Sequence, residues 1–366
     1  MAIPKAKRIL IAPLDWGLGH TARCVPLIRH ILRQGHVPIV AGNVWQRSFI
    51  EETFEAIDFI HLEGYNVRYS GWNRFLQAGL LFQLPRLYRA IQAEHEWLRQ
   101  QVEEMQIDGV ISDNRYGLYH NRVPSVVLTH QLQIKTGIGG ITDKVVRKMH
   151  YKHLDRFGQT WVVDAKGADN LADELSHPKA MPANAAYLGL LTQFENVMPD
   201  KNTDGSILIL LSGPEPQRSI LSALLWQQVQ AYTGKVIFVA GSESAAAPVF
   251  IPLHITYHKR LTGEALAPLI QNAAMVICRS GYSTIMDLAA LQKKAILIPT
   301  PGQTEQGYLG RLMQERGLFY TAAQNGFKLQ HALNEASKIS PQSFIHASHY
   351  SAYKPLLNNW INNLQQ

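Results

Sequence analysis

Short apolar runs alternate with amphipathic stretches along nearly the whole chain. In the first half these runs predict strands at residues 8–12, 37–41, 56–62, 109–112, 125–129 and 160–163. Predicted helices lie between these strands, first at 21–33 and later at about 85–105. In the second of these stretches one face repeats every three, four or seven positions, through Leu87, Ile91, Leu98, Val102 and Met105. Such alternation is typical of βαβ units built around a parallel sheet.

A polar stretch at 192–205, which contains Pro199, separates this series from a second one. The second series predicts strands at 207–211, 236–240, 254–257, 275–278 and 295–298, and a last helix at 353–364. The 366 residues suit two domains better than a single core. We therefore predict an α/β protein of two Rossmann-like domains with parallel sheets. The predicted boundaries are residues 1–195, residues 196–345, and a C-terminal helix at 346–366 that packs back toward the first domain.

The cysteine content and the lengths of the apolar runs exclude several classes of protein. The chain has only two cysteines, Cys24 and Cys278, and neither belongs to a CxxC pair or a Cys/His cluster. A disulfide framework and a structural zinc site are therefore not expected, and a reducing compartment is. The first apolar run is too short for a signal peptide, and no run reaches the length of a membrane span. We expect a cytoplasmic protein.

The formal charge of +7 favours anionic partners such as phosphorylated ligands or acidic lipids. Nucleic acid is the weakest candidate among them, because no RNA-binding or helix-turn-helix pattern is present.

A glycine-bearing turn follows the first predicted strand and leads into a helix, with Gly17 and Gly19 just before His20. Glycines at such a turn let the backbone approach a ligand closely, and the helix start offers unpaired N–H groups. The third glycine of the dinucleotide fingerprint is missing, and a histidine begins the helix instead. Its pKa near neutrality suits removal of a proton from an acceptor hydroxyl. The alternative is a histidine that only caps the helix.

Asp113 follows the predicted strand at 109–112, so it also lies at the carboxyl end of a strand. A carboxylate there could accept a hydrogen bond from the His20 imidazole, which would select its tautomer and stabilise the imidazolium. The alternative is an aspartate that caps the next turn.

The second half carries three further turns of this kind. Ser212 and Gly213 follow a strand and precede a helix, which suits a diphosphate, with Arg218 nearby. The strand predicted at 275–278 leads into the run RSGYSTIMD at 279–287, and the strand predicted at 295–298 leads into PTPGQTEQ at 299–306.

Taken together, these motifs resemble those of glycosyltransferase family 28, the MurG-like family of the GT-B UDP-glycosyltransferase superfamily. The family's Gly-x-Gly-Gly-His turn corresponds to residues 17–20, and its Ser-Gly-Ala-x-Thr-x-x-Glu pattern corresponds to residues 280–287. Its Pro-rich strand end with Gln before a helix corresponds to residues 299–306, and its Gly-Ser phosphate loop is similar to residues 212–213. The resemblance spans both domains and is strongest over 206–317. It implies the GT-B fold, in which two Rossmann-like domains face a central cleft.

The resemblance also implies roles for individual residues. The acidic residue that ends the Ser-Gly motif would bind the ribose diol of UDP, and here it is Asp287 where the family usually has Glu. Gln306 would bind donor-sugar hydroxyls, with Glu305 beside it, whereas Gly307 replaces a second Gln of the family. The uracil would pack near Arg260, Leu261 and Thr262, and the diphosphate would lie by Ser280, Gly281, Ser283 and Thr284. The alternative for residues 280–287 is an ordinary capped helix start with a nearby carboxylate.

The implied activity is transfer of a hexose or N-acetylhexosamine from a UDP-sugar to an acceptor hydroxyl with inversion, His20 assisting deprotonation. No Asp-x-Asp pair is present to hold a divalent metal against the diphosphate. We therefore expect no metal and no cofactor, with helix N-termini and basic side chains stabilising the leaving UDP.

The acceptor is less well specified. Residues 69–89 combine large apolar side chains with arginines, and residues 144–156 add positive charge. This combination suits a lipid-linked acceptor and peripheral contact with the inner face of a membrane. The alternative is a core helix flanked by solvated basic residues. Two other functions stay open at this point: a nucleotide-sugar epimerase or hydrolase, and a nonenzymatic nucleotide-sugar-binding protein.

Overall fold

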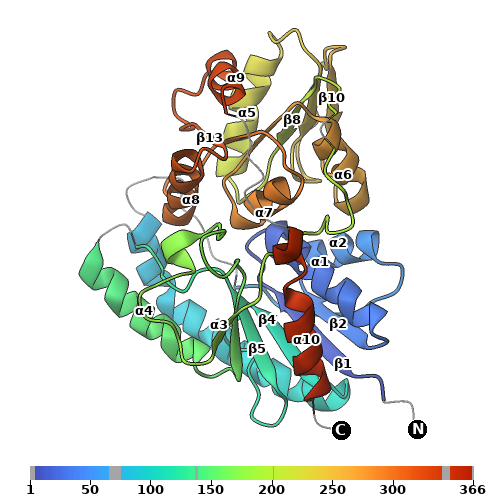
Figure 1. The fold of residues 1–366 in the computed structure, drawn as a ribbon, viewed down its shortest axis with the longest axis vertical. Helices are drawn as coiled ribbons and strands as arrows, with labels where there is room; N and C mark the ends of the chain where they lie inside the picture. Colours follow the sequence, from blue (N-terminus) through green and yellow to red (C-terminus); the bar gives the residue numbers. More distant parts are fainter. Residues whose placement is uncertain (1–4, 66–75, 137–138, 201, 340–346, 365–366) are drawn as a thin grey trace. The chain divides into compact units, whose positions relative to one another are not determined.

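The computed structural model describes residues 5–65, 76–136, 139–200, 202–339 and 347–364, with the backbone alone for 76–84 and Glu264. The chain divides into two compact units (Figure 1). The first contains the described residues up to Gln193, apart from Leu76, together with 347–364. The second contains the described residues from Phe194 to 339.

The first unit is built on a seven-stranded parallel sheet in the order β3-β2-β1-β4-β5-β6-β7. Successive strands run outward from β1 to β3 and then, from β4, outward in the other direction. The topological switch point therefore lies between β1 and β4, where Pro13 is paired with Asp113. The strands are β1 (Arg8–Pro13), β2 (Val37–Gly42), β3 (Asp58–His61), β4 (Gly109–Asp113), β5 (Ser125–Thr129), β6 (Gln159–Val162) and β7 (Ala185–Tyr187).

The helices of this unit are α1 (Leu18–Arg33), α2 (Val44–Thr53), α3 (Leu76–Glu104), α4 (Gly140–Leu154) and α10 (Tyr353–Asn362). The periodicity at 85–105 is confirmed as a helix, and its Ile91 and Leu98 are buried. Its start was predicted wrongly: α3 begins at Leu76 and continues through Pro85. Proline is most common at the first turn of a helix, which misplaced the predicted boundary.

The C-terminal helix α10 packs on α1 of the same unit (Figure 1). The Tyr353 hydroxyl donates to the Pro26 carbonyl at 3.2 Å, and His30 Nε2 lies 2.7 Å from Asn358 Oδ1. The Trp360 ring meets the buried Trp161 edge to face, with centroids 5.5 Å apart. The last helix of the chain therefore packs in the same unit as the first strand.

The second unit contains a six-stranded parallel sheet in the order β10-β9-β8-β11-β12-β13, with its switch point between β8 and β11. The strands are β8 (Ile207–Leu210), β9 (Val236–Val239), β10 (Ile255–His258), β11 (Met275–Cys278), β12 (Ala295–Leu297) and β13 (Tyr320–Thr321). The helices are α5 (Gln217–Val229), α6 (Gly263–Asn272), α7 (Tyr282–Ala290), α8 (Thr304–Glu315) and α9 (Leu329–Ser337).

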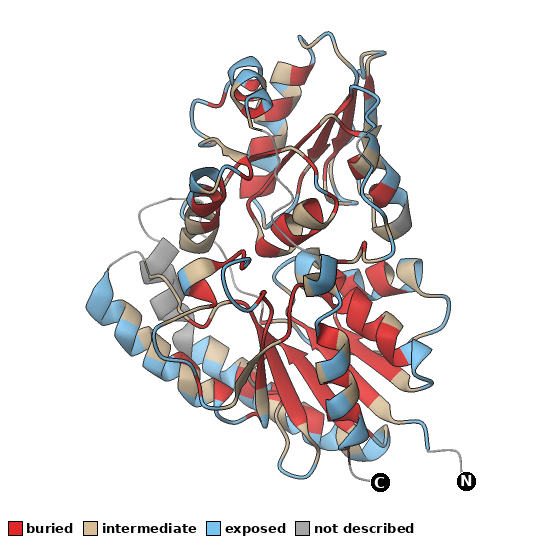
Figure 2. Cartoon of the chain, viewed as in Figure 1, coloured by how far each residue is buried: buried red, intermediate tan, exposed pale blue. Residues whose placement is uncertain are grey.

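Both sheets are buried along most of their central strands (Figure 2). Runs such as Ile9–Ala12 and Val236–Val239 read as continuous apolar strands because helices cover a parallel sheet on both faces. Two parallel-sheet α/β units are therefore confirmed. The strands β7 and β13 were not predicted, since three and two residues are too short for a periodic pattern. The domain boundaries and the central cleft stay predictions.

Candidate functional site

The turn after β1 delivers the predicted histidine to the switch point of the first sheet. Gly17, which caps α1, has a φ of +101°, a left-handed conformation that favours glycine, and no atom lies within 4 Å of where a Cβ would stand. The helix then begins at Leu18, so Gly19 and His20 lie in its first turn. Since β1 and β4 are neighbours, this turn is brought next to the carboxyl end of β4.

His20 and Asp113 are brought into direct contact there. His20 Nδ1 lies 3.0 Å from Asp113 Oδ2; Asp113 is fully buried, and the His20 side chain keeps 16% of its exposure. A carboxylate can only accept, so Nδ1 carries the proton and Nε2 presents its lone pair. Within the described residues Nε2 has no hydrogen-bond partner. This tautomer is the one that a general base requires.

Arg23, one turn further along α1, grips the same carboxylate. Its Nε donates to Asp113 Oδ2 at 2.8 Å, its terminal nitrogen contacts Oδ1, and another terminal nitrogen lies 3.1 Å from His130 Nδ1. Burial alone would raise the pKa of Asp113, but Arg23 and His20 outweigh it and lower that pKa to about 2. Asp113 is therefore ionised at neutral pH.

The pKa of His20 is lowered, first by burial and then by the charge of Arg23, and Asp113 only partly offsets these effects. The imidazole is consequently neutral at physiological pH. Sequence reasoning missed Arg23 and His130. Arg23 could have been found, because residues three apart share a helix face, and His130 follows β5, the next strand along the sheet.

Gln46 holds the glycine-bearing turn in place. Its buried side-chain nitrogen lies 3.1 Å from the Pro13 carbonyl, 3.2 Å from the Leu14 carbonyl and 3.2 Å from Thr21 Oγ1. Its oxygen accepts from the backbone N–H of Asn43, which caps α2 in return. The turn that carries His20 is thus tied to the start of a neighbouring helix.

A second buried ion pair, between Arg115 and Glu94, lies at the same carboxyl edge of the first sheet. Arg115 Nε donates to Glu94, whose other oxygen accepts from the Tyr65 hydroxyl at 2.7 Å and the Gly117 N–H at 3.0 Å. A terminal nitrogen of Arg115 also reaches the Pro13 carbonyl at 3.4 Å. Burial raises the pKa of Glu94, although Arg115 opposes it. This pair ties α3 to the end of β1.

In the second unit, the predicted diphosphate turn follows β8 at the second switch point. Gly213 has a φ of +101° and open space where a Cβ would stand. The neighbouring strand β11 leads through Arg279 into α7. Arg279 is buried and donates to the carbonyls of Gln217 at 2.7 Å, Ile298 at 3.2 Å and Pro299 at 3.3 Å. Sequence reasoning gave this arginine no role, yet it joins the turns after β8, β11 and β12.

The turn after β12 is joined to α7 more directly. The buried Ser280 hydroxyl donates to the Gln306 carbonyl at 2.8 Å, and the Gln306 side-chain oxygen accepts from the Thr300 N–H at 2.8 Å. The Gln306 side-chain nitrogen keeps no partner among the described residues, so it is oriented and available to donate to a ligand. Gly281 caps α7, with Ser283 and Thr284 in its first turn and Asp287, also buried, in its second.

The remaining predicted donor residues lie along the same carboxyl edge. Arg218, in the first turn of α5, donates to the Ala240 carbonyl at 2.9 Å and pairs with Glu215, so its guanidinium is engaged as a brace. Arg260, which follows β10, pairs with Glu243 at 3.2 Å. Leu261 and Thr262 lead into α6, and Glu305 lies in the first turn of α8. The ligand-binding roles of all these residues stay predictions.

The described residues include no group of three or more His, Cys, Asp or Glu side chains placed to hold a metal ion. Within that same part of the chain, none of the helices is both long enough and apolar enough to cross a bilayer.

Comparison with known proteins matches part of the chain to a family model. Residues 256–350 match the glycosyltransferase family 28 C-terminal domain, which confirms the resemblance. A curated relative from Idiomarina loihiensis is 30% identical over 147 residues, which are 37% of this chain and 40% of the relative. It is named UDP-N-acetylglucosamine–N-acetylmuramyl-(pentapeptide) pyrophosphoryl-undecaprenol N-acetylglucosamine transferase. The chain thus spans less than half the length of the first two curated relatives it matches.

Solved structures extend the likeness to the whole fold. The glycosyltransferase SnogD from Streptomyces nogalater aligns with a TM-score of 0.63 at 12% identity, covering 99% of this chain and all of that one. MurG of Acinetobacter baumannii aligns with a TM-score of 0.50 at 13% identity, covering 99% of both chains. At such identities the likeness shows the fold alone, and that fold is GT-B.

Proposed function

We propose that this chain, which has the GT-B fold and whose residues 256–350 match the family 28 C-terminal domain, is a glycosyltransferase. It moves a hexose or N-acetylhexosamine from a UDP-sugar to an acceptor hydroxyl with inversion. The observation that carries this proposal is the neutral His20, hydrogen-bonded through Nδ1 to the buried and ionised Asp113 at a topological switch point. Open α/β sheets bind their ligands at that position.

In the proposed reaction His20 Nε2 takes the proton of the acceptor hydroxyl as its oxygen attacks the anomeric carbon. The bond from that carbon to the UDP oxygen breaks on the opposite face, which inverts the configuration. Asp113 stabilises the imidazolium that forms, in the manner of the aspartate of a catalytic triad. Arg23 is a positioning residue, since it holds Asp113 ionised without facing the acceptor itself.

The experiment that tests the activity is a product assay with UDP-sugars in the presence and absence of candidate acceptors. A new glycoside formed only with acceptor is the expected result. Epimerised or free sugar released equally well without acceptor would instead assign the chain to an epimerase or hydrolase of the same fold.

On the donor side, we assign the ribose diol to Asp287, the diphosphate to the turns at Ser212–Gly213 and Ser280–Gly281, and the sugar hydroxyls to Gln306. Support comes from the start of α7, where helix N–H groups favour an anion, and from the oriented Gln306 amide.

Substitution of Asp287 with Ala is expected to weaken UDP binding about 100-fold, since a carboxylate that accepts from two hydroxyls contributes roughly 3 kcal/mol. Thermal-shift titrations with UDP, GDP and TDP measure both base preference and this loss. Asp287→Glu, which restores the residue usual in the family, should retain binding. Unchanged UDP affinity in Asp287→Ala would remove this residue from the donor site.

Turnover is expected to persist in EDTA, because the proposed site neutralises the leaving diphosphate with helix N-termini and basic side chains. The measurement is initial rate before and after chelation, with magnesium and manganese added back. Complete loss on chelation, reversed by either metal, would contradict this.

We further propose a lipid-linked acceptor and a cytoplasmic protein bound peripherally at the membrane's inner face. The proposal rests on residues 69–89, of which 69–75 and the side chains of 76–84 lie outside the described residues, and on residues 144–156, most of which belong to helix α4. Its exposed face carries Ile141, Val145 and Met149, which are 82%, 55% and 51% exposed. The exposed Lys144, Lys148 and Lys152 lie between and beside them. Apolar side chains bordered by lysines suit an anionic lipid surface.

Ile141→Glu is expected to lower binding to anionic liposomes about tenfold, since it removes a buried apolar contact and adds repulsion. Val44→Glu is the matched control, because Val44 is likewise exposed but lies on α2. Liposome sedimentation at low salt measures both. An absence of wild-type binding, or equal losses in the two variants, would exclude the α4 face as a membrane contact.

A further inference from the structure

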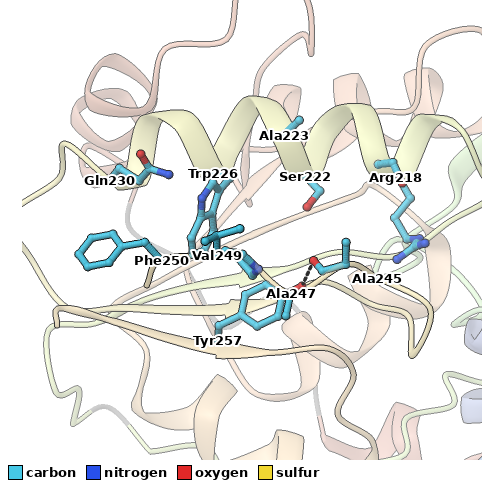
Figure 3. Close-up of a pocket in the computed structure, with 13 residues that line it drawn as sticks. Arg218, Ser222, Ala223, Trp226, Gln230, Ala245, Ala247, Val249, Phe250 and Tyr257 are labelled. Carbon is cyan, nitrogen blue, oxygen red and sulfur yellow. Dashed lines mark hydrogen bonds between the residues drawn. The ribbon is translucent and has the colours of Figure 1, made fainter. Parts of the chain in front are cut away.

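A pocket of about 620 Å³ opens in the second unit, away from the residues assigned to donor binding except for Arg218. One wall is a face of α5, another is the segment around residues 245–250, and Tyr257 of β10 lies at the base (Figure 3). A volume of this size lies within the range of small-molecule sites in proteins.

The pocket exists because of how β9 and β10 are connected. Parallel neighbours are usually joined by a crossover helix. Residues 240–254, all of which the structure describes, contain no helix and cross instead as an irregular segment. Pro248 and Pro252 disfavour a helix there. The segment's small side chains, Ala245 to Ala247, leave the space beside α5 unfilled.

The walls are predominantly apolar. The Trp226 ring meets Tyr257 edge to face, with centroids 5.7 Å apart, and Val249 and Phe250 stand across from it (Figure 3). Phe250 keeps 74% of its exposure, and Val249 and Leu253 are fully exposed along the same segment. An exposed apolar run at the rim of an apolar pocket marks a binding site more often than it marks ordinary surface.

Polar groups gather mainly at the α5 start of the pocket. Arg218 and Ser219 are both engaged with Glu215, whereas the Ser222 hydroxyl has no hydrogen-bond partner in the described part of the chain. Gln230 lies exposed at the far end. One paired arginine cannot neutralise a diphosphate, and the two remaining polar side chains, Ser222 and Gln230, cannot satisfy a sugar. The chemistry therefore favours a ligand with a long apolar body and one small polar head.

We propose that this pocket binds a single hydrocarbon chain, such as that of a fatty acid, with its head group at Ser222. The length agrees: Arg218 and Gln230 both line the pocket, and twelve residues of helix span about 18 Å. The chain lies along α5 over Trp226 and Tyr257, with Val249 and Phe250 closing over it. This site does not depend on the transferase activity, since it requires none of the residues at His20 or Asp287.

Calorimetric titration of the full chain with dodecanoate, kept below its micelle concentration, tests the site. We expect saturable one-to-one binding that Ala223→Trp, which fills the pocket, weakens at least tenfold. Gln227→Trp is the matched control, because Gln227 is an exposed residue of α5 that does not line the pocket, and its affinity should stay within twofold.

A brominated fatty acid provides a second readout that does not depend on Ala223→Trp folding. It should quench tryptophan fluorescence of the wild-type protein, and Trp226→Phe should remove most of that quenching. Absence of saturable binding, equal weakening by the two tryptophan insertions, or quenching that survives Trp226→Phe would each overturn the proposal.

Discussion

Replacement of His20 with Ala is expected to lower kcat about 10²- to 10⁴-fold, the contribution of a well-placed general base. Nε2 is the atom concerned, because Nδ1 is committed to Asp113 at 3.0 Å. Affinity for UDP should be unchanged, since the donor contacts are assigned to the second unit. Steady-state kinetics with saturating donor measures the effect. His331→Ala, an exposed histidine of α9, is the control and should retain full activity.

The pH dependence of kcat/KM should change in a defined direction. Burial and Arg23 lower the pKa of His20, so the base form is already present below the usual histidine pKa of about 6.5. The rising limb of kcat/KM should therefore have its midpoint below that value, and His20→Ala should abolish it. A His20→Ala enzyme with undiminished kcat and the same rising limb would assign the proton transfer elsewhere.

Replacement of Arg23 with Leu is expected to cost about 3–5 kcal/mol of unfolding free energy, because it leaves the buried Asp113 carboxylate without its main partner. In the wild-type protein two contacts from Arg23, together with His20, lower the pKa of Asp113 to about 2 although its burial raises it. In their absence the pKa of Asp113 rises and that of His20 rises too, since Arg23 lowers it. The rising limb of kcat/KM should then move to higher pH, an effect that lost stability alone does not produce.

The stability difference should depend on pH in a defined direction. The wild-type contribution of ionised Asp113 is present above an unfolded carboxyl pKa of about 3.9 and is lost as pH falls through about 2. In Arg23→Leu the carboxyl protonates earlier, so the deficit is largest near neutrality and narrows in acid. Urea unfolding at several pH values measures it. Arg23→Lys, which keeps the charge but loses the bidentate geometry, should be intermediate. A deficit independent of pH would contradict the role of Arg23.

Much of this molecule follows from local sequence. The central strands of parallel sheets are buried on both faces, so they read as continuous apolar runs, and each was predicted within one or two residues. Turns that carry Gly17, Gly213 or Gly281 were recognisable because glycines between a strand and a helix have few other uses. The order of those motifs along the chain then indicated the family to which residues 256–350 were matched.

The tertiary structure alone decided which side chains meet. Strand order puts β1 beside β4, with Leu10 paired to Val110, and β8 beside β11, with Ile207 paired to Met275, and nothing local specifies pairing over such separations. Only then do Arg23 and His130 join the pair of His20 and Asp113, and only then does Arg279 span three turns. The pocket beside α5 likewise depends on a missing crossover helix. Such contacts arise from packing between distant segments, whereas sequence periodicity reports only whether a segment's own face is buried.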